Sequence, residues 1–372
     1  MTSVPGEQLP GKRWWLFGPQ LDIGVFMGSA ALSLALLFWG FRRGWVYGES
    51  PEWSWVCAVL LVDVAHVWST GFRTYFDPNE VKKRPGLYIG TPLLSWIGGV
   101  LLYSFSSGVF WSGMAYLAVW HFIRQQYGWV VLYRRRCGEI DRLSHWIDSL
   151  TIYLATLFPL AYWHAHLPRK FWWFVANDFR NMPGQALASL VPVLGAAFVI
   201  SQIVYWCRSV SKWFNGTANP GKDMIVLTTT FCWYVGIVAL NSDYAFTVTN
   251  VLIHGVPYMA LVYCWQKQHN PKPVAAVNNP NEHWIGRWAR KTSSHWIPFI
   301  VTLWALAYCE EMFWDRAVWH ERGWLFGSPW DASDVQTLLV PLLAVPQISH
   351  YVLDGFIWKR RHTSDLAPAT AS

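Results

Sequence analysis

Charged residues are scarce in this chain of 372 residues: only 14% are Asp, Glu, Lys or Arg, whereas 53% are hydrophobic. A soluble domain has about a quarter of its residues charged, so the composition excludes a water-facing globule of this length. The apolar residues come instead in runs of about 20, the length of helix that crosses a hydrocarbon layer about 30 Å thick. The sequence therefore predicts an all-α, polytopic transmembrane helix bundle, with residues 1–372 forming a single integral-membrane domain.

The sequence also lacks the short motifs of common soluble enzymes. HExxH, GxSxG, Walker A and GxGxxG patterns are absent at meaningful positions, so a catalytic site would have to be assembled across helices. The six cysteines show no CxxC spacing, which favours buried free thiols over disulfides or metal ligands. Basic residues gather at helix ends rather than in a patch, which argues against a nucleic-acid partner. No cleavable signal peptide is expected, because the first apolar run is long enough to remain as a span.

Aromatic residues, in contrast, are abundant, with 28 Trp and 16 Tyr. Amphipathic rings favour the boundary between lipid headgroups and hydrocarbon, and we expect some of them to line an internal cavity. Ten apolar runs are predicted to span the membrane. They cover residues 21–40, 53–72, 87–106, 110–133, 145–163, 184–207, 223–240, 244–265, 295–314 and 335–358.

The distribution of Lys and Arg predicts the orientation of these spans. Of the 29 basic residues, Arg124 lies inside a span, and 21 lie at the N-terminus or after even-numbered spans. Because positive residues stay on the cytoplasmic side, both termini are predicted to be inside, with residues 1–20 and 362–372 as cytoplasmic tails. We expect a multi-pass protein of the cell inner membrane. The other seven basic residues lie in the opposite loops: Arg42, Arg43, Arg169, Lys170, Arg180, Arg316 and Arg322.

Four histidines lie inside the predicted spans. An ionisable side chain in hydrocarbon costs roughly 2.5–3.5 kcal/mol on insertion scales, so such residues are functional candidates. The four occupy the second, fourth, eighth and tenth spans, which run in the same direction, and at about 1.5 Å per residue their depths agree within roughly 8 Å. They can therefore converge on one centre near the midplane of the membrane. They are His66, His121, His254 and His350.

Each of these histidines has a polar companion on its own helical face. A ligating imidazole usually donates its second N–H to such a group, although the companions could be ligands themselves. Imidazole-rich sets suit Fe, Zn or Cu, and paired histidines at one level could ligate haem. The competing interpretation is that each histidine bonds an adjacent helix and stabilises packing. The companions are Asp63, Gln125, Asn250 and Asp354.

Two further residues are predicted to line the same cavity. Arg124 is the only basic residue inside a span, and it requires an anion. Candidate counter-ions are Asp63, Asp148 and Asp354, and a substrate carboxylate is the alternative. Tyr258 is expected to line the cavity together with Arg124, and these two are the candidate catalytic residues.

The local context of the histidines resembles the Brp/Blh family of integral-membrane β-carotene dioxygenases. The segment Asp63-Val64-Ala65-His66 is similar to the first HGxxD-type element of that family, with the acid on the other side. His121-Phe122 resembles the second element, Ile253-His254 with residues 263–267 resembles the third, and Pro346–Ile357 resembles the last. The chain departs from the family at Tyr258, where the third element carries a second histidine, and it is longer. The similar segments cover about 60 residues.

The resemblance implies a histidine-bound non-haem iron and cleavage of a carotenoid to retinal. Together with the buried histidines, it predicts a membrane-embedded oxidoreductase or oxygenase acting on a lipid or isoprenoid, with an electron-donor protein as a further candidate partner. Rival hypotheses are a transporter or proton-linked carrier that uses the buried His and Asp groups, a haem- or quinone-binding redox subunit, and a scaffold that would tolerate loss of the histidines.

Overall fold

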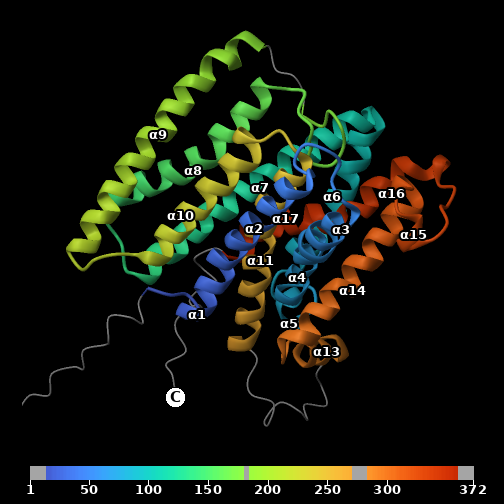
Figure 1. Cartoon of the computed structure of the whole chain (residues 1–372). Coiled ribbons are helices and arrows are strands. Elements are labelled where there is room, and N and C mark those ends of the chain that lie inside the picture. The colour runs from blue at the N-terminus through green and yellow to red at the C-terminus, as the bar shows by residue number, and fades with distance from the viewer. Residues whose placement is uncertain (1–13, 180–183, 270–282, 359–372) are drawn as a thin grey trace, which may run out of the picture. The chain divides into compact units, whose positions relative to one another are not determined.

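Helices account for all regular secondary structure in the residues that the structure describes. The computed structural model describes residues 14–179, 184–269 and 283–358. No strand occurs within these ranges, so the all-α prediction is confirmed for them. Figure 1 labels the helices along the chain.

The α-helices vary widely in length, and four π-helical segments extend them: Ile23–Met27, Trp55–Val64, Tyr234–Ala239 and Asp315–Trp319. The α-helices are α1 (Pro19–Asp22), α2 (Gly28–Arg43), α3 (Glu52–Ser54), α4 (Ala65–Arg73), α5 (Pro78–Lys83), α6 (Pro85–Phe105), α7 (Ser107–Arg136), α8 (Arg142–Ala165), α9 (Gly184–Phe214), α10 (Pro220–Trp233), α11 (Asp243–His269), α13 (Trp284–Ser293), α14 (Trp296–Trp314), α15 (Gly323–Phe326), α16 (Gln336–Leu343) and α17 (Val345–Ile357).

Every predicted span overlaps a helix, but not every helix has the composition of a span. Eight helices in the described part of the chain are long and apolar enough to cross a membrane. α7 and α8 are not among them, and α7 carries Arg124, Gln125 and Gln126 near its middle. The eight are Pro19–Arg43, Glu52–Arg73, Pro85–Phe105, Ser189–Phe214, Pro220–Ala239, Asp243–His269, Trp296–Trp319 and Ser333–Ile357.

The chain divides into two compact units. The first comprises Met1–Pro51, Val119–Trp172 and Phe179–His254, and the second comprises Glu52–Ala118, Trp173–Asp178 and Gly255–Ser372. In the first, Leu154, Ala155, Phe158 and Phe198 form a buried cluster between α8 and α9. In the second, a larger cluster surrounds Phe72, Tyr258, Phe299 and Leu303.

The π-helical segment Trp55–Val64 leads directly into α4, which carries His66. π-helical turns change which side chains share a face, and they are frequent at functional sites. Gly255 follows His254 on α11 and lies close to this segment. A Cβ atom at Gly255 would lie 2.7 Å from Cγ1 of Val62 and 3.1 Å from its carbonyl oxygen. A glycine is therefore required for α11 to approach the π-helical segment this closely.

Two helix N-termini are fixed by their caps. The Asp141 carboxylate accepts a hydrogen bond from the Ser144 backbone N–H at 2.8 Å and begins α8. The Asn219 side chain accepts from the Lys222 backbone N–H at 3.1 Å, and Pro220 at the first helical position suits the start of α10. These caps fix the first turns of α8 and α10, which carry Ser144, Lys222 and Asp223.

Candidate metal centre

His66 on α4 and His350 on α17 are both buried, and their rings are close neighbours. The ring centroids lie 4.8 Å apart, and the planes are nearly perpendicular, at 83°. The hydroxyl of Thr70, one turn after His66 on α4, lies 2.7 Å from Nδ1 of His350. When the neutral His350 imidazole donates from Nδ1 to Thr70, the lone pair is on Nε2 and can bind a metal.

Tyr258 lies beside this pair, as predicted. Its hydroxyl is 3.0 Å from the hydroxyl of Thr70, and its ring centroid lies 5.1 Å from His350 and 5.9 Å from His66. The carboxylate of Asp354 lies next to Tyr258. The phenol therefore belongs to a buried polar chain that includes Thr70 and reaches His350.

Asp63 is the polar companion of His66. Its Oδ1 lies 3.6 Å from Nδ1 of His66, three residues further along the same helical face. This distance is longer than a hydrogen bond, so a small rotation of either side chain is needed to form one. The orienting role of Asp63 therefore stays a prediction.

His121 on α7 and His254 on α11 form a second buried pair. Their ring centroids lie 5.2 Å apart at 84°. The ring of Phe122 stacks on His254, with centroids 3.4 Å apart and planes inclined by 8°. The side-chain amide of Gln125 donates to the backbone carbonyl of His254 at 2.9 Å. Gln125 therefore supports His254 on the neighbouring helix, whereas the sequence associated it with His121.

The four histidines together form a buried group that could bind a metal ion. They are 0–4% exposed, and each offers one ring nitrogen within 4.8 Å of the nitrogens of the other three. Four neutral imidazoles suit iron, zinc or copper.

Arg124 and Asn250 differ from the expectation. Arg124 is exposed; its guanidinium contacts the Tyr153 hydroxyl and lies 4.9 Å from the ring centroid of Tyr127. It does not line the histidine group, because it extends from an exposed face of α7. The buried amide of Asn250 donates to Phe246 O and to the Thr249 hydroxyl, both at 3.1 Å. Among the described residues, these donor contacts of Asn250 stay on α11, and its amide does not orient His254.

Thr70 and Phe122 were missed by the sequence analysis. Thr70 lies four residues after His66, so the same helical spacing that identified the other companions could have identified it. Phe122 follows His121 directly, and sequence spacing gives no sign that its ring covers a histidine on another helix. Contacts between helices are decided by packing, which periodicity alone does not report.

We compared the chain with protein-family models, with curated proteins and with solved structures, and no match was found in any of the three. The resemblance to the Brp/Blh family therefore stays a prediction that depends on its short motifs, and the function has to be argued from the buried histidines.

Proposed function

We propose that this protein is a membrane-embedded, metal-dependent oxidoreductase that acts on an apolar lipid or isoprenoid. The observation that carries the proposal is the buried group of four histidines within an all-helical, apolar chain. Several imidazole nitrogens gathered at one place form the donor set that iron, zinc or copper binds. We assign the ion as non-haem iron because the local motifs resemble those of the Brp/Blh dioxygenases.

His66, His121, His254 and His350 would hold the iron, which supplies redox chemistry with dioxygen when bound. Thr70, which contacts Nδ1 of His350, would leave Nε2 of that ring to the metal, and Asp63 would orient His66. Phe122 and Tyr258 cover histidine rings and help to exclude water. The Tyr258 hydroxyl, held by Thr70, is the polar group placed to orient a substrate.

The substrate class follows from the surroundings of the histidines. The helices that carry His66, His254 and His350 are apolar enough to span a membrane, so a lipid-like molecule can enter laterally. A carotenoid-like polyene is the favoured substrate. Cleavage of one carbon–carbon double bond by O₂ gives two carbonyl groups that hold both oxygen atoms, which balances without a reductant. Hydroxylation would instead require an electron-donor protein.

We further propose that the chain crosses the cell inner membrane ten times and that both termini lie in the cytoplasm. The support is the presence of a helix at each predicted span, together with the 21 basic residues on one side and seven on the other. Reporter fusions at Gly138 and at Ser372 should both report the cytoplasm. A signal from the opposite side at either position excludes the ten-span arrangement.

A proton-linked carrier is the second candidate, favoured by the partly buried Asp63 beside His66. Both candidates use these residues, but they differ in what the purified protein does. A carrier moves a solute across a sealed vesicle and needs no transition metal.

The test is turnover by purified protein in detergent, after metal analysis and an absorption spectrum. With one iron per chain, a carotenoid polyene and ¹⁸O₂, we expect carbonyl products that carry the label. Protein stripped of metal by a chelator should be inactive and should recover with added Fe²⁺. A stoichiometric haem spectrum, or solute transport by metal-free protein, would contradict the proposal.

A further inference from the structure

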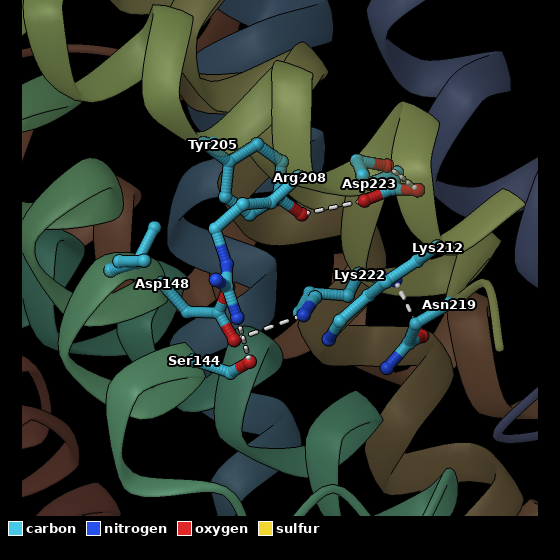
Figure 2. Close-up of a pocket in the computed structure, with 10 residues that line it drawn as sticks. Ser144, Asp148, Tyr205, Arg208, Lys212, Asn219, Lys222 and Asp223 are labelled. Atoms are coloured by element: carbon cyan, nitrogen blue, oxygen red, sulfur yellow. Dashed lines mark hydrogen bonds and ion pairs between the residues drawn. The ribbon is translucent and has the colours of Figure 1, made fainter. Parts of the chain in front are cut away.

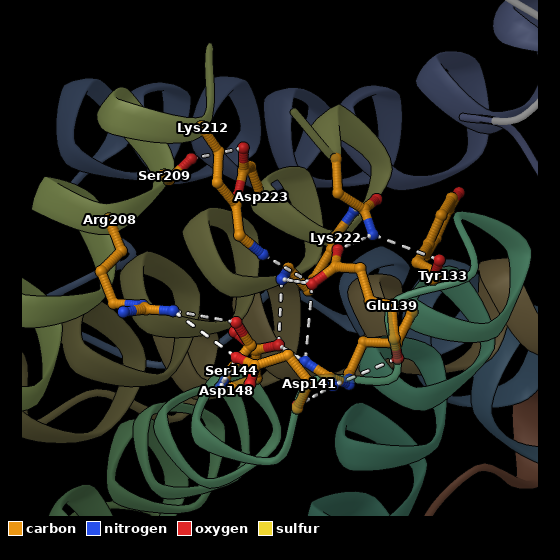
Figure 3. A network of polar contacts seen from close by, with 12 residues as sticks. Tyr133, Glu139, Asp141, Ser144, Asp148, Arg208, Ser209, Lys212, Lys222 and Asp223 are labelled. Carbon is orange, nitrogen blue, oxygen red and sulfur yellow. Dashed lines mark hydrogen bonds and ion pairs between the residues drawn. The ribbon is translucent and has the colours of Figure 1, made fainter. Parts of the chain in front are cut away.

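A second buried polar cluster lies at the ends of α8, α9 and α10, and we call it the charged network. The ammonium of Lys222, which is 4% exposed, donates to Glu139 and to Asp148, both at 2.9 Å. Lys212 donates to Glu139 at 2.7 Å (Figure 3). Arg134 binds Asp148. The Lys and Arg distribution predicts that this end of the helices is cytoplasmic. Both acids thus have fixed cationic partners.

Asp223, the third buried acid here, is held by neutral donors. It accepts from the Tyr205 hydroxyl at 2.7 Å, from the Ser209 hydroxyl at 2.6 Å and from the Trp213 indole N–H at 3.2 Å. Both of its oxygens are used. Asp223 therefore needs no cation from the network, and the cations keep their donors for other acceptors.

A shallow pocket that is open to solvent lies beside the charged network. Figure 2 shows its polar side chains turned toward one another from α8, α9 and α10. Three cations and three hydroxyls contribute to the wall. The lining residues are Ser144, Ile147, Asp148, Tyr205, Arg208, Ser209, Lys212, Asn219, Lys222 and Asp223.

The pocket has more hydrogen-bond donors than acceptors. An ammonium has three N–H donors and a guanidinium has five. Lys222 uses two of its donors and Lys212 uses one. Arg208 donates to the Ser144 hydroxyl at 3.0 Å, and its nearest carboxylate oxygen, on the exposed Asp141, is 3.8 Å away. The remaining donors fit a ligand with several anionic oxygens.

The helix arrangement favours the same kind of ligand. Asn219 caps α10, a helix of 14 residues, and Lys222 and Asp223 belong to its first turn. The N-terminus of a helix has a partial positive charge and attracts phosphate-like groups. This field adds to the charge of Arg208 and Lys212, so the pocket suits a phosphate oxygen cluster better than a cation.

Exposed apolar side chains adjoin the lining residues of the pocket, by contact or in sequence. Trp213, whose indole N–H binds Asp223, is 51% exposed. Leu143 and Trp146, next to the lining residues Ser144 and Ile147, are 57% and 71% exposed. Tryptophans with one polar contact and an exposed ring are typical of the membrane interface. The ligand phosphate is therefore expected to belong to a lipid rather than to a soluble molecule.

We propose that this pocket binds the phosphate group of an anionic phospholipid, with Arg208 and Lys212 as its movable cations and Lys222 as its fixed one. A guanidinium donates two parallel hydrogen bonds to a phosphate, which makes Arg208 the main determinant of selectivity. Binding at this pocket is independent of the histidine group and of the reaction assigned to it.

The test is native mass spectrometry of the full chain in nanodiscs of phosphatidylcholine, with and without phosphatidic acid. Wild-type protein should retain phosphatidic acid selectively. Arg208→Gln should bind it about tenfold more weakly, the size expected for loss of a charge-assisted hydrogen bond. Arg142→Gln is the matched control, because Arg142 is an exposed arginine at the same end of α8 but outside the pocket wall. It should bind like wild type.

Equal retention by Arg208→Gln and Arg142→Gln overturns the proposal, because the lipid is then held by general surface charge. Inorganic phosphate added in detergent gives a third arm. If it binds in an Arg208-dependent way while phosphatidic acid is not retained, the occupant is a soluble phosphate and the lipid assignment is wrong. Circular dichroism of both variants should match wild type, since each changes a partly or fully exposed side chain.

Discussion

The charged network and the histidine group are both buried polar clusters in an apolar protein, but their electrostatics differ. In the network, Glu139 and Asp148 are neutralised by Lys222 and its neighbours, so opposite charges stabilise one another. In the histidine group, four side chains of the same type lie together, and none is an acid. The acids of the first arrangement are neutralised within the protein, so only its spare cationic donors are left for a ligand, whereas the second arrangement gains most from a cation at its centre. The comparison separates a cluster that can accept an anion from one that can accept a cation.

The largest effect is expected for the metal ligands. His121→Ala or His350→Ala should reduce iron to background and abolish turnover, because a four-ligand group loses one bond and its symmetry about the ion. The readouts are metal analysis and activity of the purified variants. His283→Ala is the control, since His283 caps α13 and is exposed. Full iron content in either ligand variant would show that fewer than four histidines bind the metal.

The next largest effect is on stability, at the charged network. Lys222→Met leaves Glu139 and Asp148 short of a buried cation, and breaking such a pair typically costs about 3–5 kcal/mol. The measurement is denaturant-induced unfolding in detergent. Lys82→Met, at an exposed lysine of α5, should cost little. Iron content per folded chain should not change in either variant. A loss of iron in Lys222→Met would show that the charged network and the histidine group are not independent.

The network also predicts sensitivity to acid. Burial raises the pKa of Glu139, but Lys222, with Lys212 and Asn219, outweighs it and lowers the pKa from 4.5 to about 2. The folded-state pKa is lower than the unfolded one, so this contribution is present above pH 4.5 and is lost as pH falls toward 2. Thermal unfolding should record this loss. The Glu139→Gln variant should be less stable at neutral pH, and its stability should depend less on pH in this interval. An unchanged pH dependence would show that other groups cause the acid sensitivity.

The smallest effect is expected for residues that orient the ligands. Thr70→Val removes the hydroxyl that contacts His350 and Tyr258, and should weaken metal affinity about tenfold, at the low end of the range for orienting groups. A competition titration with a chelator measures it. Thr156→Val, whose hydroxyl bonds its own helix, is the matched control and should leave affinity unchanged. If the two variants behave alike, Thr70 is a packing residue.

Much of the histidine group could be predicted from sequence, because its signal is local. His66 and His254 stand out as ionisable residues in apolar runs, and helical spacing connects Asp63 to His66. Helical spacing did not predict the contacts that a side chain makes with another helix. Gln125 supports His254 rather than His121, and Arg124 lies on an exposed face of α7.

The sequence by itself determined the all-helical class, the apolar helices and the ionisable residues that lie inside apolar runs. These features depend on hydropathy and helical period, which are properties of residues close together in the sequence. Only the tertiary structure decided that Thr70 contacts His350, that Phe122 covers His254 and that Lys222 joins Glu139 to Asp148. These contacts join residues that are 74 to 280 positions apart in the sequence. Side-chain packing between helices fixes them, and packing depends on shape complementarity that a one-dimensional pattern does not contain.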